Sequence, residues 1–422
     1  MDCCYGHYGR YSLWLGLICK ELIFIKTENI NFQSFLFVLT RFKISDTINT
    51  VSPNWDHLAK GDILLHSMYL KGLEQASPNN IKLHYVEVFV DEVLAGIAVV
   101  QRVELYLRDM FRQQQVSCLK EFFRESISKV LKGTILVVGN LTHTGQHALA
   151  YESNCISKPD FYNEIFKAIS YLKDLIKLKE GKRMRAIMLK DFFLNDPMIE
   201  DGSFELQKLH KVRVQPNMIL PIRPHWHSME NYLLNLNKKY RDRYKRAKRK
   251  MSGISVKELN LLEIKSASDE LYKLYLNVSN HAKFNTFILP KDHFYSYKLQ
   301  MKETFRVFGY YLKGRLIGFF TLILNKKSLE TYFLGYDEAY QYDNQLYLNM
   351  LYNMIKFGID NDCKEIVYAR TAMEIKSSVG AEPRAMVLYL KHTNPVLNRI
   401  LKPVFKLMNP SQDWEERHPF KQ

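Results

Sequence analysis

One stretch, Phe305 to Gly380, restricts the possible folds of this chain more than any other. An aromatic and β-branched run from Arg306 to Leu312 is followed by the turn pair Lys313-Gly314 and a second apolar run, Leu316 to Leu324. Two such runs around a two-residue turn predict a β-hairpin. A third strand is expected over Leu329 to Leu334.

A buried helix and another strand follow. Leu346 to Phe357 is apolar on almost every side, which predicts a helix inside a core, ended by Gly358. Glu365 to Ala369 has the composition of a strand. This order resembles the acyl-transferring GNAT fold, and within that superfamily the Fem-like proteins of peptidoglycan biosynthesis. The resemblance implies an α/β (α+β) chain of two GNAT-like halves, each a mixed, mainly antiparallel sheet flanked by helices, and an N-acyltransferase activity.

An earlier segment repeats the hairpin pattern. Val88 to Val100 and Tyr310 to Leu322 both contain a strand, a polar turn and Leu-x-Gly, with Gly96 and Gly318 each five residues after a turn residue. We interpret this as an internal duplication. A chance likeness between two ordinary hairpins is the alternative.

With 422 residues, the chain exceeds what one hydrophobic core usually organises, so two domains are expected. We predict a first GNAT-like domain over 46–222, a basic helix at the junction over 223–260, and a second GNAT-like domain, the catalytic one, over 261–422. Residues 1–45 show no clear period. They are either an appendage packed on the body or the product of an over-extended start, and no function is placed there.

Charge and cysteine usage indicate the partner class and the compartment. The net charge of +16 and the pI near 9.3 favour an anionic partner. Six cysteines are scattered without a C-x-x-C pair, as in reduced cytoplasmic proteins. The apolar run Tyr11 to Cys19 is too short to span a bilayer. We expect a cytoplasmic protein, either free or at the inner membrane face.

A predicted basic amphipathic helix over 395–408, near the end of the chain, is of a kind that can lie on an anionic membrane surface. Packing of this helix on its own domain is the favoured interpretation, and membrane contact is a hypothesis. The oligomeric state is left open.

The segment from Ser228 to Met251 is the most strongly charged of the chain. We predict one amphipathic helix with a continuous apolar stripe and, from Lys238 onward, nine basic residues against Asp242 alone. A solvated basic face is the alternative to an anion-binding surface, for which we select Lys239, Arg241, Arg243, Lys245 and Arg246. The anion is a phosphorylated substrate or tRNA, although no RRM, KH, zinc-finger or helix-turn-helix pattern accompanies the helix.

No G-x-S-x-G elbow, Walker loop, G-x-G-x-x-G or H-E-x-x-H occurs, so a positioned carboxylate or tyrosine is expected to move the proton. Candidates gather at Tyr336, Asp337 and the segment Ala369 to Gly380. By the resemblance, Lys376 and Gly380 match a Lys-x-x-x-Gly pattern of Fem-like proteins. The resemblance implies that Arg370 and Lys376 bind an anion or the carbonyl, and that Glu374 or Asp337 transfers the proton. A structural salt bridge of Glu374 with either cation is the alternative.

The donor is left open between two carriers. GNAT enzymes that use coenzyme A carry a Gly-rich pyrophosphate loop where this chain has 340–345, so only helix-terminal amides near Asn344 and Gln345 remain for phosphates. Acyl-CoA acting on an acidic or lipid-linked amine is the first hypothesis. Aminoacyl-tRNA acting on a cell-wall precursor is the second, and a non-catalytic binder of tRNA or phospholipid the third.

The loop from Gly139 to His147 ends a predicted strand and carries two histidines, His143 and His147. We interpret these as ordinary loop groups. A zinc site would need further ligands, and none is near them in sequence. No metal is expected.

Overall fold

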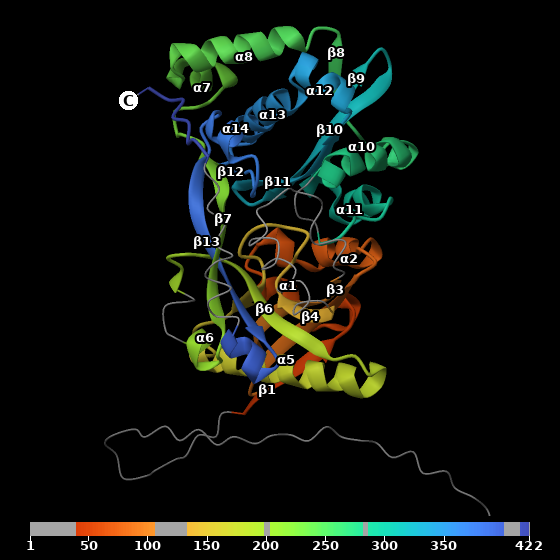
Figure 1. Cartoon of the computed structure of the whole chain (residues 1–422), viewed down its shortest axis with the longest axis vertical. Coiled ribbons are helices and arrows are strands. Elements are labelled where there is room, and N and C mark those ends of the chain that lie inside the picture. Colours follow the sequence, from red (N-terminus) through yellow and green to blue (C-terminus); the bar gives the residue numbers. More distant parts are fainter. Residues whose placement is uncertain (1–38, 106–132, 198–202, 282–285, 401–413, 422) are drawn as a thin grey trace, which may run out of the picture.

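The computed structural model describes residues 39–105, 133–197, 203–281, 286–400 and 414–421. Within these residues, the strands form one mixed, mainly antiparallel sheet in the order β1-β2-β3-β4-β6-β13-β7-β12-β11-β10-β9-β8, with β5 paired to β3. Figure 1 shows two halves stacked along the long axis, the first half low and the second half high, connected by the long strands β7 and β13. The predicted mixed, mainly antiparallel strands flanked by helices are confirmed, and the two predicted sheets are joined into one.

The first half contains the following elements: β1 (Thr40–Ser45), η1 (Ile48–Thr50), α1 (Trp55–Leu58), η2 (Ile63–Leu65), α2 (Ser67–Gln75), β2 (Ile81–Val90), β3 (Val93–Leu105), β4 (Gly133–Val138), β5 (Leu149–Tyr151), α5 (Lys158–Glu180), β6 (Met184–Phe193), α6 (Ser203–Leu206) and β7 (His210–Pro221).

The second half contains the following elements: α7 (Met229–Asn235), α8 (Lys238–Lys250), β8 (Ile254–Glu258), α9 (Leu261–Ser266), α10 (Ser268–His281), α11 (His293–Met301), η4 (Lys302–Thr304), β9 (Phe305–Leu312), β10 (Arg315–Asn325), β11 (Ser328–Tyr336), α12 (Glu338–Asn344), α13 (Leu346–Asp360), β12 (Glu365–Val367), α14 (Met373–Ser377) and β13 (Glu382–His392).

The two repeated hairpins have the same local geometry. Both turns place two residues at positive φ, Asp91-Glu92 and Lys313-Gly314, which is the type I′ arrangement. A register shift follows each turn, immediately before Gly96 and Gly318. A Cβ on Gly96 would meet the Phe161 ring of α5, and one on Gly318 would meet Met350 of α13. Each glycine therefore lets a helix of its own half lie against the sheet.

The sheet departs from the predicted domain ranges at two places. Strand β1, inside the range expected to be an extension, pairs along its whole length with β2. Strand β13, from the end of the chain, pairs with β6 of the first half as well as with β7. β1 alternates in burial as a sheet strand does, but the partners of both strands lie far away in sequence.

The predicted single helix over Ser228–Met251 is two helices. Helix α7 ends at Asn235 and α8 begins at Lys238, because Leu236 is extended and bridges to Phe420. The amide of Asn237 donates to the Pro419 carbonyl at 2.8 Å. The tail of the chain therefore breaks the helix that the apolar stripe predicts.

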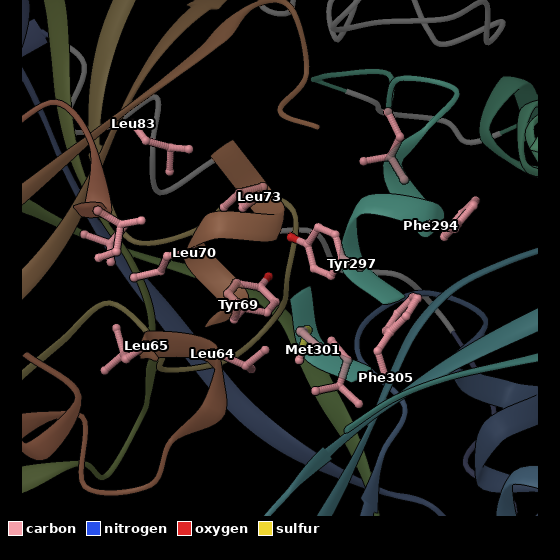
Figure 2. Packing of buried hydrophobic residues seen from close by; sticks show 14 of the residues in the cluster. Leu64, Leu65, Tyr69, Leu70, Leu73, Leu83, Phe294, Tyr297, Met301 and Phe305 are labelled. Atoms are coloured by element: carbon pink, nitrogen blue, oxygen red, sulfur yellow. The ribbon is translucent and has the colours of Figure 1, made fainter. Parts of the chain in front are cut away.

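One apolar core joins the two halves. Figure 2 shows this core, to which one half contributes Leu64, Leu65, Tyr69, Leu70 and Leu73 and the other half contributes Phe294, Tyr297, Met301 and Phe305. The first group comes from η2 and α2, and the second from α11 and the start of β9. The Tyr69 and Tyr297 rings meet edge to face, 5.2 Å between centroids. The halves share buried apolar surface as well as strands.

Among the described residues, no helix has the length and apolar character needed to cross a membrane. The predicted amphipathic tail is described only at its start, where residues 395–400 are helical. The remainder of that prediction lies outside the described residues.

Candidate functional site

Two neighbouring parallel strands part in the second half. β11 and β12 pair from Ser328↔Glu365 to Glu330↔Val367, and no further pairing follows. Directly after this point β11 bulges, with Tyr332 and Phe333 opposite the single residue Thr321 of β10. The Thr321 hydroxyl donates to the Phe333 carbonyl at 2.7 Å. Parted strands beside a bulge turn backbone groups away from the ladder, where they can meet a ligand.

The first half is built differently at the equivalent place. There β4 and β6 run parallel up to Val138↔Leu189. Opposite the single residue Val99 of β3, the chain leaves the sheet for residues 139–148 and returns as β5. The Gly139 amide donates to the Val99 carbonyl and the Val99 amide to that of Ala148, which closes the base of this loop. Where the second half has a short bulge, the first half has this ten-residue loop, which reaches β11 of the second half.

Four side chains meet where this loop contacts β11, and we call them the junction cluster: Asp62, His143, His147 and Glu330. His143 Nε2 lies 3.2 Å from Glu330 Oε2, and His147 Nδ1 lies 2.7 Å from Asp62 Oδ2. His143 and Glu330 are buried, although 187 residues separate them. The site therefore draws on both halves of the chain.

Burial and charge act in opposite directions on these groups. Burial lowers the pKa of His143, more than the nearby Glu330 carboxylate raises it. For His147, burial alone would lower the pKa, but the Asp62 carboxylate more than offsets this and the pKa is raised. Burial would raise the pKa of Asp62, and the His147 imidazolium reverses the sign. Asp62–His147 is thus favoured as an ion pair, while His143 is favoured as a neutral imidazole.

A second group of charges lies beside the junction cluster: the buried Lys190 and Asp191, and the partly buried Arg370. Asp191 pairs with both cations and also accepts from the Gly145 amide at 3.2 Å. Lys190 Nζ donates to the His143 carbonyl at 2.7 Å. Asp191 has a φ of 60°, uncommon for a residue other than glycine. The predicted anion-binding residue Arg370 is therefore held by a carboxylate of the first half.

Aromatic side chains line the junction cluster on the side of α11. Tyr332 packs with its ring centroid 5.7 Å from that of His143. The Tyr332 hydroxyl contacts His293 Nε2 at 3.0 Å and the Tyr297 hydroxyl at 3.3 Å. Burial lowers the pKa of His293 to about 4, so this imidazole is neutral at physiological pH.

A groove lies on the opposite side of the parted strands, between α8, α14, the start of α13 and the tail. We call it the basic groove; it is lined by Lys239, Tyr240, Arg243, Arg246, Gln345, Ala372, Met373, Glu374, Ile375, Ser378, Trp414 and Arg417. Glu374 pairs with Arg417. The buried Oε1 of Gln345 has no hydrogen-bond partner among the described residues. With four cations and one anion, the groove suits an anionic ligand.

The groove contains three of the five cations predicted for anion binding. Lys239, Arg243 and Arg246 recur at spacings of four and three, so they share one face of α8. Arg241 lies elsewhere and donates to the Leu236 carbonyl, and Lys245 is exposed outside the groove.

The predicted proton-transfer residues lie apart from the junction cluster. Asp337 caps α12, accepting from the Ala339 amide at 3.1 Å, and pairs with Arg315 at 2.8 Å. Tyr336 is half-buried at the end of β11, 6.5 Å between ring centroids from Tyr347 of α13, and burial raises its pKa. Glu374 lies in the groove, in the ion pair with Arg417 that replaces the predicted pairing with Arg370 or Lys376.

The remaining predicted residues have structural partners. Asn344 Nδ2 donates to the Lys250 carbonyl at 2.8 Å and so fixes the end of α8. Lys376 is buried, and its ammonium donates to the carbonyls of Tyr368 and Arg370, both at 2.6 Å. Burial lowers the pKa of Lys376 to about 7. This lysine therefore holds the segment that follows β12.

The amides at the start of α13 are partly used by the chain itself. The Gln345 amide donates to the Gln341 carbonyl, and the Tyr347 amide to Gln341 Oε1 at 2.9 Å. Two of the four amides that a helix start offers to a phosphate are thus engaged.

Sequence reasoning missed Asp62, Lys190, Asp191 and Glu330. Glu330 is a charged residue inside an otherwise apolar strand, and Lys190-Asp191 interrupts another. A buried charge is rare unless it has a partner, so these interruptions were a signal that could have been followed. Glu330 also supplies a third potential ligand beside the two loop histidines, which the sequence did not place there.

Comparison with known proteins identifies the domain. Residues 238–377 match the family model described as acetyltransferase (GNAT) domain. The structure is similar to a crystal structure of FemX, with a TM-score of 0.50 and 11% identity, covering 87% of this chain and 100% of that one.

It is also similar to a tandem GNAT protein from the clavulanic acid biosynthesis pathway, with a TM-score of 0.49 and 9% identity, covering 84% and 99%. A sequence search of curated proteins finds no match. Residues 238–377 are thus an acetyltransferase (GNAT) domain, and the fold that the chain shares with FemX extends over both halves.

Proposed function

We propose that the second half transfers an acyl group from a phosphate-bearing carrier to an amine, with Glu330 as the proton acceptor. The observation that carries this proposal is the position of Glu330: it is the last residue of β11 that pairs with β12, at the point where these two strands part, and it is buried against His143. The parted strands receive the donor carbonyl, and the basic groove receives the carrier's phosphates.

The reaction needs a proton acceptor and an oxyanion donor. The amine nitrogen attacks the carbonyl carbon, the carbonyl oxygen takes the negative charge, and a backbone amide at the β11 bulge stabilises it. Glu330 takes the amine proton, directly or through one water. As the bond to the carrier breaks, the leaving sulfur or oxygen takes up a proton, and the product is an amide.

The contrast between the halves supports placing the reaction in the second one. In the first half, the loop 139–148 fills the equivalent gap: its Asn140 accepts from Gln101 at 3.0 Å, and its amide at Leu141 donates to Gln101 at 2.8 Å. Gln101 and Asn140 are both buried. The first half thus contributes a loop to the site of the second.

Two donors fit the basic groove, and one observation favours aminoacyl-tRNA. A pyrophosphate of acyl-CoA is expected at the amides that begin α13. Two of these amides already donate to Gln341, one to its backbone carbonyl and one to its side-chain oxygen. The groove instead offers side-chain cations, which follow a polyanion well. The acceptor we propose is an amine on an acidic or lipid-linked molecule, of which a cell-wall precursor is one example.

We place this reaction in the cytoplasm. Cys155 and Cys363, the cysteines within the described residues, are both unpaired. Free thiols are usual in a reducing compartment.

The test combines donor binding with one variant. The purified chain is offered acetyl-CoA, a long-chain acyl-CoA and charged tRNA, each at ~100 times its Kd, where a bound ligand stabilises the fold by about 2.7 kcal/mol. The donor that stabilises the chain is then used, with label in its acyl group, in a transfer assay with amine acceptors. We expect Glu330→Gln to bind that donor normally and to lower kcat at least 100-fold.

Glu338→Gln is the matched control, since Glu338 is an exposed carboxylate on α12. Equal turnover by the Glu330→Gln variant and the unmodified chain would remove Glu330 from the reaction. Stabilisation by acyl-CoA alone would reverse the choice of donor.

A further inference from the structure

Three side chains of the junction cluster also have the chemistry and spacing of a metal site. His143, His147 and Glu330 each offer one ligand atom, and these atoms lie within 4.8 Å of one another. His143 Nε2 and Glu330 Oε2, 3.2 Å apart, have the separation of two ligands on one ion. Two imidazoles and one carboxylate are a donor set that Zn²⁺ and its neighbours in the first transition series bind well.

The surroundings of His147 add an independent argument. Asp62 lies 2.7 Å from Nδ1 of His147 and holds the proton on that nitrogen, so Nε2 is the nitrogen that gives up its proton and binds a metal. Asp62 is itself oriented by Asn325 Nδ2 at 3.0 Å and by the Leu64 amide at 3.2 Å. A carboxylate that fixes the second nitrogen of a histidine is the usual outer support of a histidine metal ligand.

The site also has a position for a fourth ligand. Two ligands come from the loop 139–148 of the first half and one from β11 of the second, so a bound ion would link the halves. Three protein ligands leave the remaining position of a tetrahedral ion to water or substrate. The Lys190 ammonium lies nearby on the His143 carbonyl, but Asp191 neutralises it.

We propose that His143, His147 and Glu330 form a site for a divalent transition-metal ion, for which Zn²⁺ is the probe. A bound ion occupies the lone pairs of Glu330 and His143. It therefore competes with the amine proton for the Glu330 carboxylate. Micromolar Zn²⁺ therefore blocks acyl transfer reversibly; this second part rests on the proposed function, whereas the binding itself does not.

Binding is measured first, without any assay of activity. The full chain is stripped with a chelator, dialysed and titrated with Zn²⁺ by calorimetry, and bound metal is counted by mass spectrometry. Co²⁺ in place of Zn²⁺ reports the geometry through its visible absorption. We expect one equivalent of metal per chain, and absorption of the intensity that four-coordinate Co²⁺ gives.

Variants assign the ion to these residues. His147→Ala is expected to weaken binding at least 100-fold, and Asp62→Asn, which keeps all three ligands, by 10- to 100-fold. His57→Ala, at an exposed histidine on α1, is the matched control and keeps full affinity. Circular dichroism shows whether each variant is folded. If His147→Ala does not fold, the affinity of Asp62→Asn tests whether the ion binds at these residues.

The outcomes separate the two parts. Equal affinity in the unmodified chain, His147→Ala and Asp62→Asn, or no binding above that of a control protein, overturns the site. Binding at the site without loss of transfer leaves the metal site standing and overturns the blocking step, and with it the role of Glu330 as proton acceptor.

Discussion

At the scale of single residues, the site depends on charges buried in mutual contact. Asp191 is fully buried between Lys190 and Arg370, and the Glu330–His143 pair is buried beside it. Removing one partner of such a group leaves the other charged and desolvated, which costs far more than the loss of an exposed ion pair. The side chains that hold the halves together at this point are thus also the ones that surround the proposed reaction.

The substitution Asp191→Asn tests this cost. We expect it to lower the free energy of unfolding at pH 7 by about 3–5 kcal/mol, because the buried Lys190 and the partly buried Arg370 lose their anion. Urea unfolding monitored by circular dichroism measures it. Asp343→Asn, at an exposed position of α12, should change stability by less than about 0.5 kcal/mol.

The difference in stability between Asp191→Asn and the unmodified chain should decrease as the pH falls. Burial alone would raise the pKa of Asp191, but the Lys190 and Arg370 cations more than offset this and lower it. The stabilisation that ionised Asp191 contributes is therefore complete above about pH 4, the ordinary pKa of an aspartate. It is lost as the pH falls through the lowered pKa that Asp191 has in the folded state. A gap between the variant and the unmodified chain that stays constant into acid would contradict this assignment.

At the scale of elements, α8 presents one basic face to the groove and another to solvent. Lys239, Arg243 and Arg246 line the basic groove. Lys238, Lys245 and Arg249 are exposed and lie outside it. The two sets carry equal charge on the same helix, so a comparison between them separates a site from general attraction.

Replacing the first set by alanine should weaken binding of the anionic donor at least tenfold. If the donor is a single-stranded polyanion, the slope of log K against log salt should also fall by about 0.7 for each phosphate that the variant no longer neutralises. Replacing the second set should leave both quantities nearly unchanged. Equal effects of the two triple variants, measured by fluorescence anisotropy over a salt series, would show that the groove is not the binding surface.

Gly335 on β11 marks a close approach between elements. A Cβ there would clash with the backbone of Leu274 and Tyr275 in α10, whereas one on Gly318 would meet only the flexible end of Met350. Backbone cannot move aside as a side-chain end can. We expect Gly335→Ala to cost about 3 kcal/mol and Gly318→Ala about 1 kcal/mol in urea unfolding. The reverse order would show that α10 shifts freely on the sheet.

At the scale of the whole molecule, the halves are joined too closely to unfold independently. β13 pairs with both β6 and β7, and one apolar core contains residues of α2 and α11. Each half would lose strand pairs and core contacts if the other unfolded.

Calorimetry of the full chain should therefore show one transition. Phe161→Ala, in the core of the first half, and Met350→Ala, in that of the second, should both lower the same Tm. Two separate transitions, each shifted by only one of the variants, would contradict the shared core.

The local elements of this protein can be predicted from short stretches of its sequence. Both hairpins, the buried helix α13 and the cationic α8 follow from patterns within some fifteen residues, because turns, amphipathic periods and burial preferences act at that range. The repeated Leu-x-Gly also indicated the two related halves, since each glycine meets a helix of its own half.

The site, in contrast, depends on contacts between residues that are far apart in the sequence. Glu330 meets His143 across 187 residues, Arg370 pairs with Asp191, and β13 pairs with β6 of the first half. Such pairings depend on which strands become neighbours, and a strand's own alternation is satisfied equally well by many partners. The charges that interrupt β6 and β11 were visible in the sequence, but their partners exist only once the two halves are folded together.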